Sequence, residues 1–201
     1  MIPYRLLTLA DRVASYAAMI PYPDSVPAVS PTGRWLNGVW LLGNNYRGSG
    51  YYGAYPPSYV RRIAALFPDV APERWLHLFS GSLAPDVPGI RVDLRPPGDG
   101  VAPASVRADA RALPFVDGAI PFCAADPPYT TADAARYGTG TLNKPRVFGE
   151  LARVVAPGGH LVWLDTTLPL YRKVDWHHWG MIAVQRSTNH RTRLCSMFTR
   201  Q

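Results

Sequence analysis

Four short apolar runs in the middle of the chain each lead to a glycine or an aspartate, and no other feature restricts the fold as much. The runs cover residues 75–80, 90–95, 105–110 and 119–125, and the signals at their ends are Gly81, Asp93, Asp109 and Asp126. Short strands that alternate with connectors predict an α/β fold with an open, mostly parallel sheet. The carboxyl ends of such strands meet at one edge, where ligands bind. We therefore expect these four residues to surround one ligand site.

Helical and strand patterns on both sides extend this prediction. Apolar residues at helical spacing predict helices over residues 1–19, 58–67 and 145–155. Strands are predicted over residues 160–166, 181–186 and 193–199, the last two antiparallel. Asn37-Gly38 is a turn signal and predicts a short hairpin within residues 34–46. The Gly- and Tyr-rich residues 44–57 are either a lid over a ligand or a surface loop.

Length and composition favour one globular domain. The 201 residues are 47% hydrophobic, which is enough for a core without disulfides. Arg5, Asp11 and Arg12 interrupt the apolar pattern of the first helix, as in an amphipathic helix rather than a signal peptide. No apolar run approaches the roughly 20 residues of a membrane span. Cys123 and Cys195 form no disulfide or zinc pattern, so a cytoplasmic location is the simplest interpretation.

Positive charge is concentrated near the end of the chain. The formal net charge is +7, and residues 172–200 contain six Lys or Arg but a single acid, Asp175. Such a region either binds phosphates or is a solvated basic face. The charge therefore allows nucleic acid as a partner without requiring it.

The residues at the strand ends have the chemistry of a nucleoside pocket. Gly81 lets the backbone approach a ligand closely, because no side chain intervenes. Asp93 can accept hydrogen bonds from a ribose diol, and Asp109 can accept from an adenine amino group. Together they predict a site for an adenosine-containing cofactor. The alternative is that these aspartates are surface turn residues, which are common at strand ends.

Several segments, in this order, resemble the class I methyltransferases that use S-adenosylmethionine. The matching stretches are "LHLFSGS" (76–82), "VDLRP" (92–96), "ADARALPFVDGAI" (108–120) and "ELARVVAPGGHLVWLD" (150–165), with a fainter likeness in "YYGAYPPSYVRRIAALF" (51–67). "AADPPYT" (124–130) resembles the Asp-Pro-Pro-Tyr motif of the enzymes that methylate exocyclic amino groups of adenine or cytosine in DNA. The resemblance covers about residues 50–200.

This resemblance implies a Rossmann-like, mostly parallel sheet of seven strands, with S-adenosyl-L-methionine as the cofactor and no metal. It implies one methyltransferase domain over residues 1–201, with an N-terminal helix, hairpin and lid in 1–57, a catalytic core in 58–201 and no target-recognition domain. The implied cofactor-binding residues are Tyr55, Pro57, Phe79, Ser80, Gly81, Asp93, Asp109 and Asp126. The implied substrate-binding residues are Tyr129, Tyr137, Lys173 and Arg191.

The chain departs from the family pattern around the glycine motif. His77 replaces the usual acidic residue of the first strand, and Leu83 replaces the last glycine. Gly81 and Asp93 are also closer than the usual separation of about 20 residues. Residues 82–89 contain two prolines and are too few for a crossover helix, so we predict that this helix is reduced or missing. These departures leave an inactive homologue as an alternative.

The Asp-Pro-Pro-Tyr segment can prepare an amino nitrogen for methylation. That nitrogen is a poor nucleophile because its lone pair is delocalised into the ring. Two acceptors aimed at its hydrogens free the lone pair, and Asp126 and the carbonyl of Pro127 can supply them. Pro127 and Pro128 hold that carbonyl rigidly, because proline fixes φ and restrains the residue before it. Tyr129 can stack on the target base. The alternative is a Pro-rich loop that caps a helix starting near Thr131.

Three functions compete on this basis. The first is methyl transfer to a nucleobase amino group, with DNA adenine N6 favoured over RNA. The second is the same chemistry on RNA, a nucleoside or a small metabolite. The third is a non-catalytic nucleic-acid-binding or partner subunit with the same fold. The sequence leaves open whether the chain acts as a homodimer or with a partner subunit, and no membrane association is expected.

Overall fold

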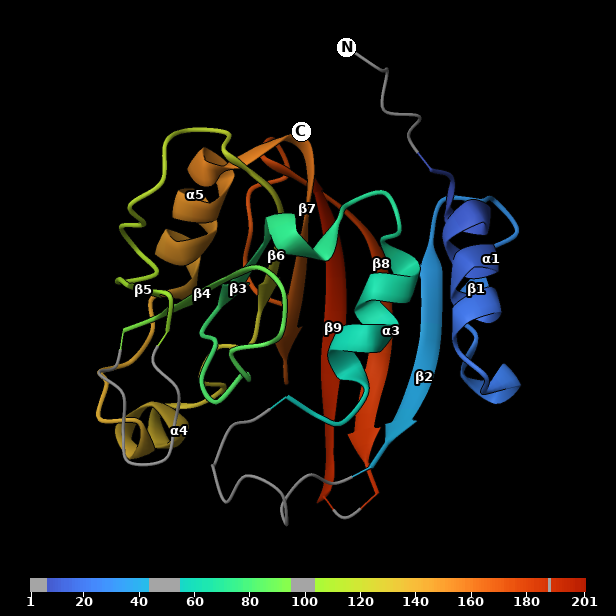
Figure 1. The fold of residues 1–201 in the computed structure, drawn as a ribbon, viewed down its shortest axis with the longest axis horizontal. Coiled ribbons are helices and arrows are strands. Elements are labelled where there is room, and N and C mark those ends of the chain that lie inside the picture. Colours follow the sequence, from blue (N-terminus) through green and yellow to red (C-terminus); the bar gives the residue numbers. More distant parts are fainter. Residues whose placement is uncertain (1–6, 44–54, 95–103, 188) are drawn as a thin grey trace.

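A computed structural model describes residues 7–43, 55–94, 104–187 and 189–201, which form one mixed sheet with helices on both sides (Figure 1). The strands are β1 (Ala28–Val29), β2 (Leu36–Leu42), β3 (Trp75–Leu78), β4 (Ile90–Asp93), β5 (Val106–Arg107), β6 (Ile120–Ala125), β7 (Val155–Asp165), β8 (Trp176–Arg186) and β9 (Asn189–Arg200). The α-helices are α1 (Leu9–Met19), α3 (Tyr59–Leu66), α4 (Thr131–Arg136) and α5 (Lys144–Val154), and Pro23–Ser25 and Pro72–Arg74 are short 3-10 turns. The α/β prediction is confirmed.

The order of the strands places a switch point at β3. The nine-stranded sheet runs β1-β2-β8-β9-β7-β6-β3-β4-β5. From β3 the chain builds β4 and β5 on one side and then crosses to β6 and β7 on the other, all of them parallel. A doubly wound sheet binds ligands outside the carboxyl ends of its strands, where the direction of winding reverses. Here that position lies beyond the ends of β3 and β6, at the lower edge in Figure 1.

The prediction of seven strands was wrong, because β1 and β2 extend the sheet to nine. β8 and β9 are the two antiparallel strands expected at the end of the chain. β2 adds to the far side of β8 in a parallel register. Pairing of this kind joins segments far apart in the sequence, so no local sequence pattern predicts it.

The expected hairpin turn at Asn37-Gly38 is absent, since both residues lie inside β2. The apolar alternation of Leu36, Trp40 and Leu42 buries one face of the strand and overrides the turn signal. β2 instead pairs with β1 across a turn at residues 30–34. Residues 44–54, most of the segment predicted as a lid or surface loop, lie outside the described residues.

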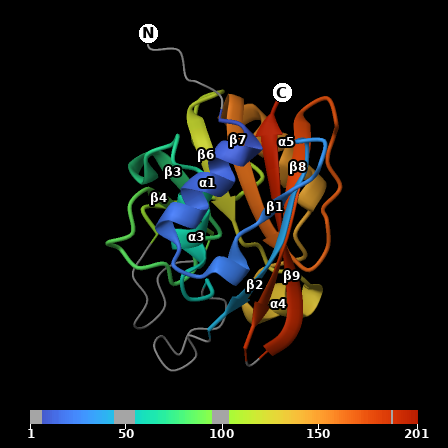
Figure 2. The ribbon, with the colours of Figure 1, turned by 90° about the vertical axis from the view of Figure 1, so that its right-hand side faces the viewer.

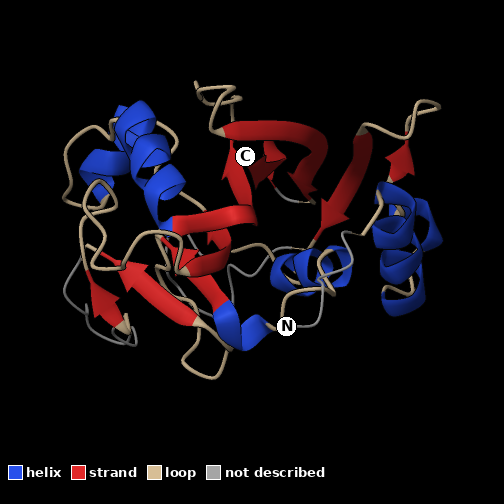
Figure 3. Cartoon of the chain, turned by 90° about the horizontal axis from the view of Figure 1, so that it is seen from above, coloured by secondary structure: helices blue, strands red, loops and turns tan. Residues whose placement is uncertain are grey.

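Helices lie on both faces of the sheet (Figures 2 and 3). The described residues form two apolar cores. One contains residues of α1 and α3, such as Tyr16 and Ile63, with the inner residues of β2, β8 and β9. The other contains the apolar side of α5, including Phe148 and Leu151, packed on β6 and β7. None of the helices in these described parts of the chain is long and apolar enough to cross a membrane.

The connection from β3 to β4 contains no helix over residues 79–89, as its length and prolines predicted. The connection packs back onto β3 instead. Gly89 has a φ of 110°, and a Cβ there would lie 2.7 Å from the carbonyl oxygen of Trp75. The Nε2 of buried His77 donates to the carbonyl of Pro88 at 3.0 Å, and burial lowers the pKa of this imidazole. His77 therefore anchors the short connection.

Candidate functional site

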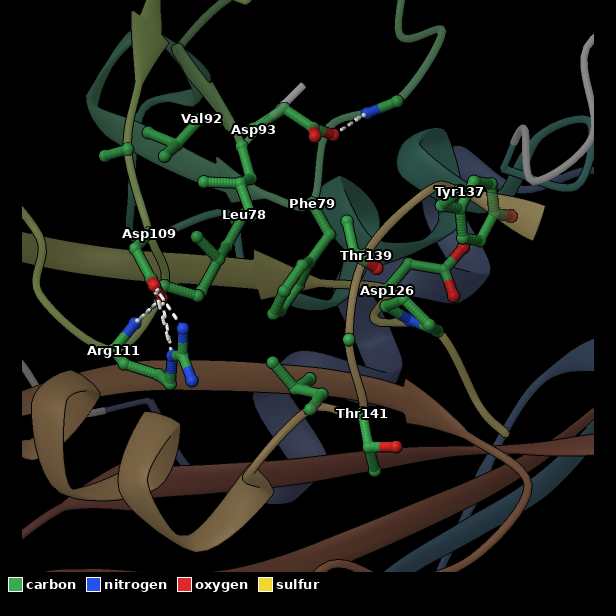
Figure 4. A pocket seen from close by; sticks show the side chains of 17 residues that line it. Leu78, Phe79, Val92, Asp93, Asp109, Arg111, Asp126, Tyr137, Thr139 and Thr141 are labelled. Atoms are coloured by element: carbon green, nitrogen blue, oxygen red, sulfur yellow. Dashed lines mark hydrogen bonds and ion pairs between the residues drawn. The ribbon is translucent and has the colours of Figure 1, made fainter. Parts of the chain in front are cut away.

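A pocket opens at the switch point of the sheet, and all four strand-end residues line it (Figure 4). Gly81 follows β3, Asp93 ends β4, Asp109 follows β5 and Asp126 follows β6. Leu78, Phe79, Val92 and Ala108 contribute apolar walls, and Tyr137 and residues 139–142 line another side. The structure thus brings together residues that are spread over about 45 positions of the sequence, as parallel strands with a common edge require.

The turn after β3 has an unusual backbone. Phe79 has a φ of 60° and Gly81 a φ of 51°, so two residues of this turn are in the left-handed region. Left-handed backbone is uncommon for a bulky residue such as phenylalanine and is frequent at functional sites. The turn directs the N–H of Gly81 to the Oδ2 of Asp93, at 2.9 Å. This hydrogen bond fixes the Asp93 carboxylate beside the glycine turn.

Asp109 is held by an arginine two residues further along the chain. The Nε of Arg111 donates to Oδ1 of Asp109 at 2.9 Å, and its Nη2 donates to Oδ2 at 2.6 Å. These hydrogen bonds lower the pKa of the Asp109 carboxyl, which keeps it ionised at neutral pH. A ligand amino group would therefore have to share this carboxylate with Arg111 (Figure 4).

Asp126 is the most perturbed carboxyl at the site. Its backbone N–H donates to the carbonyl of Leu78, and its Oδ1 accepts a hydrogen bond of 2.5 Å from the Tyr129 hydroxyl. Burial raises the pKa of Asp126 from 3.8 to about 7, although the Tyr129 hydrogen bond and the charges of Arg193 and Arg186 act in the opposite direction. A carboxyl of this kind can bind or release a proton near neutral pH.

The Asp-Pro-Pro-Tyr segment also leads into a helix. Thr130 and Asp133 form a capping box, with the Thr130 hydroxyl accepting from the N–H of Asp133 at 3.1 Å. Helix α4 therefore begins at Thr131, as the alternative interpretation of this segment predicted. The capping role does not compete with a role in the pocket, because Asp126 and Pro128 line the pocket and Thr130 caps the helix.

A partly buried ion pair behind this segment was not predicted. The Nζ of Lys144 donates to the Oδ2 of Asp165 at 2.6 Å and approaches the carbonyl of Tyr129 at 3.4 Å. Asp165 is fully buried at the end of β7, where it also accepts from the indole N–H of Trp163. Its position at a fifth strand end was the signal that could have revealed it. The pair ties the Asp-Pro-Pro-Tyr segment to β7.

Some predicted cofactor-binding residues lie outside the pocket. The residues that line it include neither Ser80, Tyr55 nor Pro57. Ser80 is buried under the turn, and its Oγ makes no hydrogen bond within the described residues. Tyr55 stacks on Tyr59 with 5.4 Å between ring centres. Burial raises the pKa of Tyr55, and the charge of Asp126 adds a smaller effect in the same direction.

The predicted substrate-binding residues divide into two groups. Tyr137 lines the pocket, and Arg191 lies over Tyr129, with its Cζ 5.8 Å from the ring centre. Lys173 lies elsewhere, because its carbonyl accepts from Gln201, at the edge where β8 begins and β9 ends. That edge is opposite to the carboxyl end of β6, so the structure does not bring Lys173 to the site. The separation follows from the antiparallel course of β9.

The described residues contain no group of three or more His, Cys, Asp or Glu side chains arranged to hold a metal ion. The two cysteines are free and buried, Cys123 in the core under α5 and Cys195 in the core under α3.

Comparisons with known proteins find similarity among solved structures only. No protein-family model and no curated protein matches the sequence. Among solved structures, the chain is similar to TrmN from Thermus thermophilus, with a TM-score of 0.47 and 18% sequence identity. The match covers 77% of this chain and 50% of TrmN, so the chain spans about half the length of that protein.

Proposed function

We propose that the chain is an S-adenosylmethionine-dependent methyltransferase that acts on an exocyclic amino group of a nucleobase, with DNA adenine N6 as the favoured target. One observation carries the proposal. Asp126, the aspartate of the Asp-Pro-Pro-Tyr segment, lines the same pocket as Gly81, Asp93 and Asp109. The residue assigned to the nucleophile and the residues assigned to the cofactor therefore share one cavity.

The chemistry of the pocket is compatible with this cofactor. The apolar side chains of Leu78, Phe79 and Val92 provide surfaces for a flat ring. Asp93 is fixed beside Gly81, where a ribose diol would require an acceptor. The missing helix after β3 does not remove either group, because the hydrogen bond between Gly81 and Asp93 closes the short connection directly.

S-adenosylmethionine, when bound, supplies an electrophilic methyl group attached to a positively charged sulfur. Asp126 is the acceptor for the substrate amino group in this proposal. The Oδ1 of Asp126 already accepts from Tyr129. We therefore assign Oδ2 to accept from one hydrogen of the substrate amino group, and the Pro127 carbonyl to accept from its other hydrogen. With a pKa raised by burial to about 7, Asp126 can also hold the proton that the nitrogen gives up.

In this proposal Tyr129 has a positioning role beside the stacking that the sequence predicts. Its hydroxyl orients the Asp126 carboxylate, and the guanidinium groups of Arg191 and Arg193 lie 5.8 and 5.3 Å from its ring centre. Tyr129 is therefore a positioning residue for Asp126. Stacking of a target base on this ring stays a prediction, and the base would share the ring with the two arginines.

The test is a transfer assay with radiolabelled S-adenosylmethionine over DNA, RNA and free nucleosides, followed by identification of the product by mass spectrometry. The proposal expects an N-methylated base, and expects Asp126→Ala to abolish transfer while cofactor affinity stays nearly unchanged. Methylated RNA or nucleoside without methylated DNA would support the alternative substrates. Comparable turnover by Asp126→Ala would refute the role of Asp126. A cytoplasmic location stays a prediction.

A further inference from the structure

The carboxylate of Asp109, which the sequence assigns to an adenine amino group, is already engaged by Arg111. The backbone N–H of Arg111 donates to Oδ1 at 2.9 Å, its Nε donates to Oδ1 at 2.9 Å, and its Nη2 donates to Oδ2 at 2.6 Å. The same Nε also lies 3.1 Å from Oδ2. A carboxylate has about four acceptor sites, so this one arginine uses most of them. Asp109 therefore keeps little capacity for a neutral amino group of a ligand.

Arg111 lines the pocket itself and has donors to spare. Its side chain is 42% exposed, so a ligand in the pocket can reach it. The guanidinium turns the edge formed by Nε and Nη2 toward Asp109. Its Nη1 makes no hydrogen bond within the described residues, and Figure 4 shows one guanidinium nitrogen without a dashed line, on the side away from Asp109. The edge formed by Nη1 and Nη2 is therefore available to a ligand.

The order of the strands brings this edge close to the base of a bound nucleoside. The proposed function places the ribose at Asp93, beside the N–H of Gly81. Asp93 ends β4, which pairs in parallel with β5, and Asp109 and Arg111 follow directly after β5. A base is attached to its ribose, so it extends from Asp93 toward a neighbouring strand end. The strand end on this side carries Asp109 and Arg111, and both line the same pocket as Asp93.

A guanidinium edge only donates hydrogen bonds, so it selects acceptors on the base. The ring nitrogens of a purine are acceptors, whereas the amino group of adenine is a donor and gives Arg111 nothing to bind. A base with two neighbouring acceptors, such as O6 and N7 of hypoxanthine or guanine, matches two parallel N–H groups best. The free edge of Arg111 is therefore complementary to the acceptor side of a purine, and the amino group is not required.

We propose that Arg111 determines which base the cofactor pocket accepts, by donating to a ring acceptor of a purine while Asp109 holds its guanidinium in place. The inference rests on the proposed function, since it takes the position of the ribose at Asp93 from it. It names the ligand class: purine nucleosides, with or without an exocyclic amino group. Asp109 is a positioning residue in this account. The pocket should therefore accept hypoxanthine in place of adenine.

Binding of adenosine and inosine to the full chain tests the proposal, with ligand-observed NMR or calorimetry as the measurement. Inosine has a carbonyl oxygen where adenosine has its amino group, so it gains the acceptor pair O6 and N7 and loses the amino donor. The wild type should bind inosine at least as tightly as adenosine. If Asp109 accepted directly from the amino group, inosine would instead bind roughly tenfold more weakly, the effect of losing a hydrogen bond to a charged group.

Substitutions at the two residues separate contact with the ligand from support of that contact. Arg111→Met should weaken binding of both nucleosides by roughly tenfold, because it removes the donors. Arg111→Lys keeps the charge but not the pair of parallel N–H groups, so it should bind inosine no better than adenosine. The double variant Arg111→Met/Asp109→Ala should bind no more weakly than Arg111→Met alone, because Asp109 acts through Arg111. A direct contact between Asp109 and the base would make the two losses add.

The matched control is Arg146→Met. The charge of Arg146 also acts on the Asp109 carboxyl, but Arg146 is an exposed residue of α5 and is not among the described residues that line the pocket. We expect its affinity for both nucleosides to stay within about twofold of the wild type, since an exposed charge at a distance contributes little. The control thus separates a contact made by Arg111 from a general effect of positive charge near Asp109.

Three results would overturn the proposal: weaker binding of inosine than of adenosine by the wild type, undiminished binding by Arg111→Met, or no binding of either nucleoside. Titration of the same proteins with S-adenosylmethionine separates this failure from that of the proposed function. Binding of S-adenosylmethionine that Arg111→Met leaves unchanged removes the role of Arg111 and keeps the methyltransferase. Nucleoside binding that depends on Arg111, without binding of S-adenosylmethionine, removes the methyltransferase and keeps the contact with the base.

Discussion

Replacing Asp126 by asparagine should stabilise the folded protein above pH 7, although it removes the proposed acceptor for the substrate. Burial raises the pKa of Asp126 from 3.8 to about 7, so ionising this carboxyl in the folded state is unfavourable. One pKa unit corresponds to about 1.4 kcal/mol, so at pH 8 the charged carboxylate costs the fold about 4 kcal/mol. Asparagine has no charge to bury and can still accept the Tyr129 hydrogen bond.

The stabilisation by Asp126→Asn should grow as the pH rises. Between about pH 4 and pH 7 the unfolded chain has released the Asp126 proton while the folded chain still holds it, so wild-type stability falls as the pH rises. The free energy of unfolding of Asp126→Asn, relative to the wild type, should therefore increase by about 3 kcal/mol between pH 5 and pH 8. Urea unfolding of both proteins at these two pH values measures this difference. Any effect of the substitution that does not depend on pH cancels when the two pH values are compared. A difference that does not change with pH would refute the buried, neutral Asp126.

The remaining predictions concern other parts of the fold and site. Asp69→Asn should destabilise the protein at neutral pH by on the order of 3 kcal/mol, because it leaves buried Arg12 without its carboxylate. Burial opposes ionisation of Asp69, but hydrogen bonds from His160 and Arg12 lower the pKa of Asp69 overall. The stability lost in Asp69→Asn, measured by urea unfolding, should therefore shrink below about pH 4. This pH dependence is the reverse of that of Asp126. Gly89→Ala should lower the free energy of unfolding by about 1–3 kcal/mol, plus the cost of the clash with the backbone of β3. Gly33 is also at positive φ, but a Cβ there would have no neighbour within 4 Å. Gly33→Ala should therefore destabilise the protein less, as measured by thermal unfolding. Asp93→Ala should weaken S-adenosylmethionine binding roughly tenfold or more by calorimetry, and an unchanged Kd would place the ribose elsewhere.

The strand ends were predictable because the signal is local. Each of Gly81, Asp93, Asp109 and Asp126 follows an apolar run, and the parallel arrangement of the sheet brings such ends together without further information. The missing helix between β3 and β4 was predictable for a similar reason, since eight residues with two prolines cannot form a crossover helix. Length and proline content are properties of the segment itself.

Contacts between distant segments were not predictable from local patterns. Asn37-Gly38 has the composition of a turn, but pairing with β8 about 140 residues later makes it part of a strand. The arginines around Tyr129 and the ion pair of Lys144 likewise depend on how β8, β9 and α5 meet β6. The basic end of the chain was visible in the sequence, but its division between two edges of the sheet follows from the antiparallel course of β9. That division separates Arg191 from Lys173.

Calorimetric titration with S-adenosylmethionine near pH 7, in buffers of different ionisation enthalpy, tests most directly whether the pocket holds a methyl donor beside Asp126. A cation next to this carboxyl lowers its pKa, so binding should release up to about half a proton from the wild type and almost none from Asp126→Asn. The absence of binding heat, or equal proton release by the two proteins, would contradict the placement of the donor at Asp126.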